Sequence, residues 1–426
     1  MSAARRPVIG TLLDGDLADL AVRFGRGPTG RRWVATLPWD ALTQHTLIIG
    51  STGTGKTVTM MRLVSSVLAT ARASGHPLRI IYADAKGLGL SEQRMFDRIV
   101  AGHGIRRVHH WPDQPIDGMS GTRFQLRERL SGLFDSGESA FHHAEAMTML
   151  DLALGVGPLP TTLEEVIRRT QPGSTARRYE QEGTEEATRL QQQAKHFTNT
   201  QWQALYLRLR ALQATLADRL DAGHGSPRLD QIEAAWLSLP GTTAGQSAGD
   251  AAAWLLALLG ELAGSSSRIP TLVLLDEFSA VAGRTGAAAA GLAERTRSAG
   301  VALVFGAQSL ASLGEHAERL MANVGTNIIH RVPMPQPLLE LAGTTTVWED
   351  LHQTGASGLR IASGGRLQQT YSIPPELIRS LPAGQAVIVR QGHWGHVSVA
   401  PPSPVLEARR LPLSVAPRNS RMRPGN

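Results

Sequence analysis

A glycine-rich run of eight residues carries the clearest chemical signal in the sequence. The run, Gly50-Ser51-Thr52-Gly53-Thr54-Gly55-Lys56-Thr57, satisfies the pattern G-x-x-x-x-G-K-[ST] of phosphate-binding loops. Glycines let the backbone turn tightly and present N–H groups to phosphate oxygens, and a helix that follows adds the positive end of its dipole. Lys56 would reach the β- and γ-phosphates, and Thr57 would ligate Mg²⁺. The run therefore predicts a site for ATP and Mg²⁺.

A pair of acidic residues supplies the partner that such a loop needs. In RIPTLVLLDEF, Asp276 and Glu277 stand directly after a buried-strand pattern. We expect Asp276 to hold Mg²⁺ through water and Glu277 to polarise the water that attacks the terminal phosphate. Solvated acids at a strand end are common, but together with the phosphate-binding loop this pair favours nucleotide hydrolysis.

Two other predicted strand ends carry polar residues. Gln308 closes GVALVFGAQ, where it would lie at the carboxyl edge of the sheet and orient water or sense hydrolysis. Asp84 and Lys86 follow the apolar run of RIIYAD. This second motif fits a functional turn and an ordinary turn equally well, so we assign it no role.

Two arginines end a helical pattern shortly before the Gln308 strand. Multimeric phosphate-loop motors use an arginine from a neighbouring subunit to stabilise charge on the transferred phosphoryl group. Arg295 and Arg297 are placed for such a role at a subunit boundary. Because arginine is abundant in this chain, a solvated helix end explains them equally well.

These residues require strands and helices that gather them at one sheet edge. TLIIG (46–50) is a short apolar run that ends at the glycine-rich loop, and helical spacing follows over VTMMRLVSSVLATARA. RIIYAD is a second buried-strand pattern, and RRVHHW near 106–111 is a weaker third. Strand, helix and strand in this order predict a βαβ unit, hence an α/β fold with a mostly parallel central sheet.

The middle of the chain has a different amino-acid composition. It is rich in Leu, Ala, Gln, Glu and Arg, and one predicted helix face carries Leu205, Leu209, Leu212 and Leu216. AAAWLLALLG (251–260) fits a buried core helix. An α/β pattern then follows. Helices are expected at 287–298 and 313–322. Strands are expected at 271–277, 300–308, 326–332, 366–372, 386–390 and 395–399. The predicted organisation is an N-terminal strand-rich segment (1–45), an ATPase domain (46–119 and 263–400), an all-α insertion (120–262) and a basic Pro/Arg-rich tail (401–426).

Composition excludes several classes of protein. The 42% hydrophobic and 19% charged residues of this 426-residue chain exclude a disordered polyelectrolyte and support a sizeable core. No apolar run reaches the ~18 residues of a membrane helix, and the first residues lack the apolar stretch of a secretion signal. The absence of cysteine removes disulfides and thiol chemistry. We therefore expect a cytoplasmic protein that is at most peripheral to the inner membrane.

Arginine greatly outnumbers lysine in this chain, and much of the net positive charge lies in the C-terminal tail. Of the 43 Lys and Arg residues only three are lysines, Lys56, Lys86 and Lys195. Where lysine persists against such a bias, we infer that its chemistry is needed. The formal net charge is +7, but the tail after residue 400 holds five arginines and one glutamate, so the rest is only mildly basic. Net charge is therefore weak support for nucleic-acid binding.

Six motifs in order resemble one family. They are HTLIIGSTGTGKT, IIYADAKG, LVLLDEF, RSAGVALVFGAQSLASLG, ANVGTNIIHRV and LPAGQAVIVRQG. Together they resemble the FtsK/HerA superfamily and, within it, the TraG-like type IV coupling proteins of conjugative DNA transfer. The resemblance covers roughly 40–110 and 250–400, and the block between matches the position of the all-α domain that coupling proteins insert.

The resemblance implies a RecA-like P-loop NTPase that hydrolyses ATP at the subunit interfaces of a homo-hexamer. It implies DNA as a partner, taken as single-stranded and relaxase-linked, together with type IV secretion or relaxosome proteins. Lys56 and Thr57 match the Walker A motif, and Asp276 and Glu277 match the Walker B motif. Gln308 matches the sensor glutamine, and Arg297 matches the arginine finger. Asn323 lies in a family motif to which we assign no chemical role.

Alternative functions remain open at the level of sequence. The same motor could serve DNA repair or chromosome handling, as HerA- and FtsK-like proteins do. A secretion ATPase that moves protein substrates would show no stimulation by DNA. A scaffold that binds ATP without turnover is the least specific alternative, and the Asp276-Glu277 pair argues against it. Single- and double-stranded DNA cannot be distinguished from the residues, because binding directed at the backbone leaves no sequence code.

Overall fold

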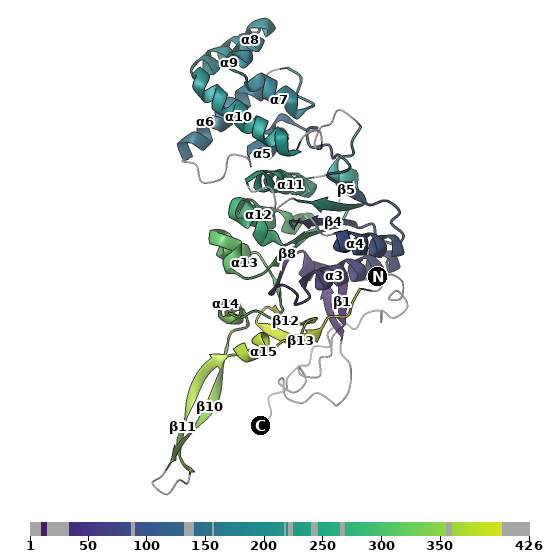
Figure 1. Ribbon diagram of the computed structural model, residues 1–426, viewed down its shortest axis with the longest axis vertical. Coiled ribbons are helices and arrows are strands. Elements are labelled where there is room, and N and C mark those ends of the chain that lie inside the picture. The colour runs from purple at the N-terminus through teal and green to yellow at the C-terminus, as the bar shows by residue number, and fades with distance from the viewer. Residues whose placement is uncertain are drawn as a thin grey trace, which may run out of the picture.

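A nine-stranded sheet forms the centre of the protein in a computed structural model (Figure 1). The strand order is β13-β12-β9-β3-β8-β7-β4-β6-β5. In chain order the strands are β3 (Thr46–Ile49), β4 (Arg79–Asp84), β5 (His109–Trp111), β6 (Ala234–Ser238), β7 (Thr271–Asp276), β8 (Val301–Ala307), β9 (Thr326–Ile329), β12 (Gln385–Arg390) and β13 (His393–Ser398). The structure describes residues 10–14, 34–86, 90–131, 140–155, 157–216, 219, 225–239, 246–264, 269–354 and 360–402.

The sheet is mostly parallel, as predicted. Within the run from β9 to β5 in the sheet order, each pair of neighbouring strands is parallel. At the other edge, β12 is antiparallel to β9 and β13 is antiparallel to β12. Because parallel strands share one carboxyl edge, the ends of β3, β4, β7 and β8 bring their following residues together.

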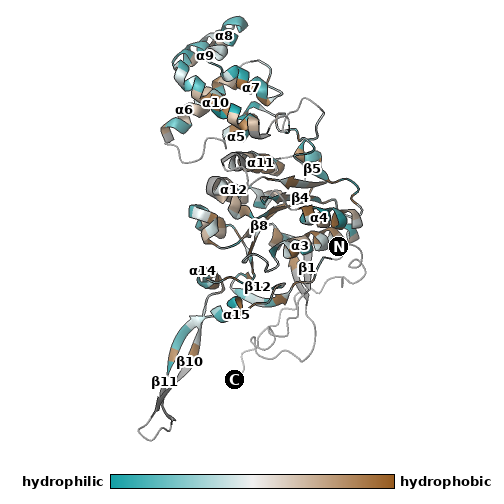
Figure 2. Cartoon of the chain, in the orientation of Figure 1, coloured by the Kyte–Doolittle hydropathy of each residue, from teal (hydrophilic) through white to brown (hydrophobic). Residues whose placement is uncertain are grey.

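The central strands are buried on both faces, which explains their nearly continuous apolar runs. In β4, Ile80 and Tyr82 belong to one buried cluster, whereas Ile81 and Ala83 belong to another. This alternation follows from the two-residue period of a strand. Figure 2 shows the central sheet strands largely in the hydrophobic colour and helix α8 (Ser174–Glu182) largely in the hydrophilic one.

Helices cover the sheet on both sides. Helices α3 (Lys56–Ala73) and α4 (Leu90–Gly102) pack with the cluster that includes Tyr82. Helices α11 (Gln246–Gly264) and α12 (Ala282–Thr296) pack with the cluster on the other face (Figure 1). The segment predicted as a buried core helix lies in α11, where Leu255 and Leu259 are buried. Among the helices in the described ranges, none combines the length and the apolar character that a bilayer crossing requires.

A block of helices extends from one end of this layered core (Figure 1). Its members are α5 (Arg123–Ser131), α6 (Ala140–Leu154), α7 (Leu163–Thr170), α8, α9 (Glu185–Lys195) and α10 (Asn199–Leu216). The predicted apolar face of α10 is buried at Leu205, Leu209 and Leu212. The side chain of Leu216 lies outside the described residues.

The expectation of helices alone between 120 and 262 is wrong at 234–238. These residues form β6, which lies between β4 and β5 in the sheet. Its sequence, AAWLS, has no β-branched residue and sits among helix-forming residues, so it gives little strand signal. Tertiary context decides the conformation here, because Trp236 stacks on Tyr82 with ring centroids 4.6 Å apart.

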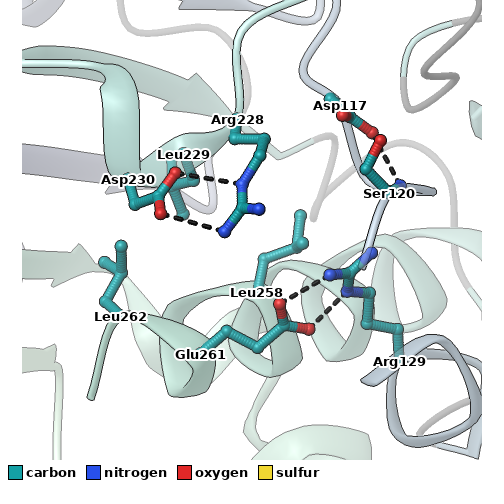
Figure 3. Close-up of a pocket in the computed structure, with 9 residues that line it drawn as sticks. All are labelled: Asp117, Ser120, Arg129, Arg228, Leu229, Asp230, Leu258, Glu261 and Leu262. Carbon is teal, nitrogen blue, oxygen red and sulfur yellow. Dashed lines mark hydrogen bonds and ion pairs between the residues drawn. The ribbon is translucent and has the colours of Figure 1, made fainter. Parts of the chain in front are cut away.

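An ion pair joins α5, the first helix of the helical block, to α11, which comes after the block in the chain. Figure 3 shows Arg129 of α5 facing Glu261 of α11. Arg129 Nη2 donates to Glu261 Oε2 at 2.5 Å, and its Nη1 donates to the Gly118 carbonyl at 2.6 Å. The guanidinium thus connects the start of the block to a helix that packs on the sheet.

Two hairpins lie outside the central sheet. The predicted N-terminal strands are β1 (Gly10–Asp14) and β2 (Val34–Pro38), which pair with each other. The strand expected at 366–372 is the end of β11 (Arg360–Tyr371), which pairs with an unpredicted strand, β10 (Thr344–Thr354). Its exposed residues Val347 and Trp348 show no alternation with buried ones, so the usual strand pattern is missing. The tail from 403 onward lies outside the described residues.

Candidate nucleotide-binding site

The glycine-rich loop joins β3 to α3, in the position predicted from the sequence. β3 ends at Ile49, and α3 begins at Lys56. Gly53 and Gly55 have φ angles of 75° and 109°, which side chains with a Cβ rarely adopt. Ser51 N donates to the Arg331 carbonyl at 2.9 Å, whereas Thr52 and Gly53 at the tip are exposed. The loop is therefore fixed at its base and open at its tip.

Lys56 is buried at the start of α3 with its ammonium group turned back to the loop. Its Nζ donates to the Gly50 carbonyl at 2.7 Å, and only 6% of the residue is exposed. Burial lowers the pKa of Lys56, and the carboxylates of Glu277 and Asp276 act in the opposite direction. The lysine is thus held by backbone carbonyls within the field of the two predicted acids.

Asp276 joins the loop to β7. Thr57 Oγ1 donates to Asp276 Oδ2 at 3.0 Å, and the Tyr82 hydroxyl donates to the same oxygen at 2.7 Å. The other oxygen, Oδ1, accepts from the backbone N–H of Glu277 at 2.9 Å. Burial, and secondly the Asp276 carboxylate, raise the pKa of Tyr82 well above its usual value, so the phenol remains a donor.

The oxygen atoms of Thr57 and Asp276 fit the preferences of Mg²⁺. This ion takes oxygen ligands, commonly one or two from the protein with the rest from water and substrate phosphates. A hydroxyl and a carboxylate that meet beside a phosphate-binding loop supply such a set. Within the described residues no group of three or more His, Cys, Asp or Glu forms a separate metal site.

Glu277 follows Asp276 in a left-handed conformation, with φ of 53°. This strained turn aims its carboxylate along the sheet edge, where Gln308 Nε2 donates to Glu277 Oε1. Lys86 Nζ lies 3.8 Å from the other oxygen, Oε2. The structure thus brings together the ends of β4, β7 and β8, as the predicted parallel order requires.

Asp84 lies beside Asp276 on the neighbouring strand, in register with it. Its Oδ1 accepts from the backbone N–H of Lys86 at 3.0 Å, and the residue is buried. Burial raises the pKa of Asp84, and the nearby Asp276 carboxylate raises it further. Asp84 therefore shapes the turn that carries Lys86, which the sequence alone could not decide.

The loop has a support that the sequence analysis missed. His330 follows β9 and lies behind the loop, where a Cβ on Gly50 would come 2.6 Å from the His330 Cβ. Gly384 N donates to the Thr54 carbonyl at 3.0 Å, which ties the start of β12 to the loop. Both residues occur in motifs quoted above, ANVGTNIIHRV and LPAGQAVIVRQG. A histidine directly after an apolar run and a glycine directly before one were the available signals.

Two further candidates lie away from this cluster. Arg297 is exposed at the end of α12, before the first residue of β8, whereas Gln308 follows the last residue of β8. A strand of seven residues is roughly 20 Å long, so Arg297 lies near the opposite edge of the sheet. Asn323 Nδ2 donates to the Arg319 carbonyl at 2.9 Å at the end of α13 (Ala317–Ala322), which gives it a capping role.

Comparison with known proteins agrees with the resemblance predicted from the motifs. Residues 14–105 match the sequence model of the FtsK/SpoIIIE family. A search of curated proteins finds no match to the sequence.

Solved structures share the fold over nearly the whole chain. The bacterial conjugative coupling protein TrwBdeltaN70, in an unbound form, is 14% identical, with a TM-score of 0.60 and 97% of each chain covered. TrwB with the non-hydrolysable ATP analogue ADPNP is 15% identical, with a TM-score of 0.57, covering 96% of this chain and 98% of that chain. VirB4 of Thermoanaerobacter pseudethanolicus is 13% identical, with a TM-score of 0.54, covering 92% of this chain and 96% of that chain. The fold is therefore that of the TrwB and VirB4 structures, which fits the RecA-like P-loop fold that the resemblance implied.

Proposed function

We propose that the protein is an ATP-hydrolysing motor that moves DNA, acting as the coupling protein of a conjugative type IV secretion system. The observation that carries the proposal is the convergence of five side chains at one sheet edge. These are Lys56, Thr57, Asp276, Glu277 and Gln308. They come from three separate parts of the chain, and each has the chemistry that its position in ATP hydrolysis requires.

The site supports hydrolysis through the chain's own residues. Lys56 would bind the β- and γ-phosphate oxygens, and Thr57 and Asp276 would hold Mg²⁺, which neutralises phosphate charge when bound. Glu277 would accept a proton from water as the water oxygen bonds to the γ-phosphorus. The bond from that phosphorus to the β–γ bridging oxygen breaks, and ADP and phosphate leave. Gln308 would orient the Glu277 carboxylate, to which it donates.

The assembly and partners belong to the same proposal. The similar fold of TrwB, described as a bacterial conjugative coupling protein, supports transfer of DNA in conjugation. We expect a homo-hexamer with ATP at subunit interfaces, single-stranded, relaxase-linked DNA as cargo, and type IV secretion or relaxosome proteins as partners. The exposed position of Arg297, far from its own subunit's site, suits a finger supplied to a neighbour.

ATP hydrolysis with and without DNA tests the proposal. The full chain is assayed alone, with single-stranded DNA and with duplex DNA, while light scattering gives its mass in solution. We expect DNA to raise the rate, and we expect Lys56→Ala and Glu277→Gln to lower it by roughly 100-fold or more. Wild-type activity in both variants would overturn the hydrolytic mechanism.

DNA dependence separates the proposed motor from the alternatives. Hydrolysis that depends on Lys56 but ignores DNA would overturn the DNA motor and favour a secretion ATPase for proteins. Stimulation by DNA together with nuclease genes beside its own gene would favour a repair motor, whereas neighbouring relaxase genes would favour conjugation. Tight ATP binding without turnover would indicate a nucleotide-regulated scaffold.

A further inference from the structure

Lys86 lies closer to the proposed reaction than an ordinary turn residue would. Its ammonium nitrogen is 3.8 Å from Glu277 Oε2, whereas Gln308 contacts the other carboxylate oxygen, Oε1. The Glu277 side chain is 7% exposed, whereas the Lys86 side chain is 39% exposed. The acid is thus buried in the site, while the lysine side chain is partly open to solvent.

The backbone that carries Lys86 is anchored to the catalytic strands. Its N–H donates to Asp84 Oδ1 at 3.0 Å, and the preceding residue, Ala85, donates its N–H to the Asp276 carbonyl at 3.1 Å. The Asp84 carbonyl in turn accepts from Leu239 N at 2.7 Å. A partly exposed side chain therefore extends from an anchored backbone next to Asp276 and Glu277.

The charges of two lysines and three carboxylates, those of Asp84, Asp276 and Glu277, act on one another at this sheet edge. The charge of Lys86 is near enough to Lys56 to act, together with burial, in lowering the pKa of Lys56. The carboxylates of Glu277 and Asp276 act in the opposite direction. A nucleotide triphosphate would bring several negative charges into this balance, and Glu277 would then face a like charge. A cation between the γ-phosphate and Glu277 would relieve that repulsion.

The occurrence of lysine rather than arginine at position 86 also supports a contact with the γ-phosphate. Of 43 basic residues in the chain, all but three are arginines, yet two of the three lysines lie at this site. An ammonium on a flexible four-carbon stem can leave one anion and reach another, whereas a guanidinium binds one carboxylate in a planar fork. A role that requires transfer between two anions explains why lysine occurs here.

We propose that Lys86 is a second phosphate-contacting lysine, which leaves the Glu277 carboxylate for the γ-phosphate when ATP binds. The proposal rests on the proposed ATPase function. The released Glu277 accepts a proton from the attacking water as the water oxygen bonds to the γ-phosphorus. The bond to the β–γ bridging oxygen breaks, ADP leaves with that electron pair, and Lys86 stabilises charge on the transferred phosphoryl group. Lys86 thereby distinguishes ATP from ADP within its own subunit.

Nucleotide binding and hydrolysis by Lys86 variants test this proposal. Affinities for ADP and for a non-hydrolysable ATP analogue are measured by calorimetry, and hydrolysis is measured in the steady state. For Lys86→Ala we expect the preference for the analogue over ADP to fall about tenfold and kcat to fall roughly 10- to 100-fold. Affinity for ADP should change less than about threefold, because ADP lacks the γ-phosphate. Lys86→Arg should leave kcat well below wild type, because its fork keeps Glu277 paired.

The third lysine of the chain provides a matched control. Lys195→Ala removes the same charge at an exposed position at the end of α9 and should retain wild-type values. If Lys86→Ala fails to fold, Lys86→Met keeps the length of the stem and replaces it. An unchanged preference for the analogue together with an unchanged kcat overturns the proposal. Wild-type protein that binds but does not hydrolyse ATP would instead refute the proposed function, and the ratio of affinities would still decide the role of Lys86.

Discussion

His330 and Thr59 meet behind the phosphate-binding loop, with His330 Nε2 2.9 Å from Thr59 Oγ1. The other ring nitrogen, Nδ1, lies 2.9 Å from the Gln385 carbonyl, which can only accept a hydrogen bond. Nδ1 therefore carries the proton of the neutral ring, and Nε2 accepts from the Thr59 hydroxyl. In this neutral form the histidine links β12, β9 and α3.

This link predicts a loss of stability at mildly acidic pH. Burial lowers the pKa of His330 to about 4 from an ordinary value of 6.5, with a further contribution from Lys56. Between these two values the unfolded chain binds a proton that the folded chain does not, so the free energy of unfolding falls as pH drops. The contribution of His330 is fully present above pH 6.5 and declines by about 3 kcal/mol towards pH 4. Urea unfolding at pH 7.5 and pH 5 measures the change.

A non-titrating variant isolates this contribution from those of other groups. His330→Gln should lower stability at pH 7.5 and flatten the difference between the two pH values. His393→Gln, which changes an exposed histidine on β13, should leave the difference as in the wild type. An equally steep pH dependence in His330→Gln would contradict the assignment.

The contact between Thr57 and Asp276 predicts a change in metal dependence. Thr57→Ala removes the hydroxyl that lies 3.0 Å from Asp276 Oδ2, so one oxygen ligand of the proposed Mg²⁺ site is lost. We expect the Mg²⁺ concentration for half-maximal hydrolysis to rise about 10- to 100-fold. Thr57→Ser keeps the hydroxyl and should remain near wild type. Equal Mg²⁺ dependence in the two variants would show that the hydroxyl does not hold the metal.

The ion pair between Arg129 and Glu261 predicts a large effect on stability. The Arg129 side chain is 4% exposed, and the Glu261 side chain is 22% exposed. Arg129→Met would leave a partly buried carboxylate without its partner and detach α5 from α11 (Figure 3). We expect a loss of about 2–4 kcal/mol, reduced from the cost for a fully buried pair because Glu261 meets some solvent.

A neighbouring ion pair on the same helix provides the comparison. Arg127 pairs with Asp151, and their side chains are 30% and 47% exposed. Arg127→Met should therefore cost about 0–1 kcal/mol, since water screens the exposed pair. Urea or thermal unfolding of the two variants compares them directly. Equal losses would show that burial of the Arg129–Glu261 pair does not increase its contribution to the free energy of unfolding.

The sequence allowed prediction of those site residues that follow from strand order. Asp276 and Gln308 each lie at the end of an apolar run. Parallel strands place such ends along the carboxyl edge of the sheet. His330 and Gly384 could not be predicted as partners of the loop, because their contacts depend on how β9 and β12 pack behind it. Strand β6 was missed for a related reason, since its conformation depends on neighbours that are distant in sequence.

The position of Arg297 predicts how mixed assemblies will behave. Its own subunit's site lies at the other edge of the sheet, so an arginine finger would have to act on a neighbour. Arg297→Ala should lower hydrolysis roughly 1000-fold or more while leaving nucleotide binding intact. Arg295→Ala, which removes a second exposed arginine of the same helix end, serves as the control and should be nearly normal.

Mixing two inactive variants tests whether the arginine acts between subunits. Arg297→Ala retains an intact acid and Glu277→Gln retains an intact finger, so an interface that takes the acid from one and the finger from the other is complete. In an equal mixture, random head-to-tail assembly makes roughly a quarter of the interfaces complete, and hydrolysis should recover towards that fraction. Recovery should require co-assembly, which light scattering of a tagged mixture detects. Mixed assemblies that stay inactive would show that Arg297 does not complete the site of a neighbouring subunit.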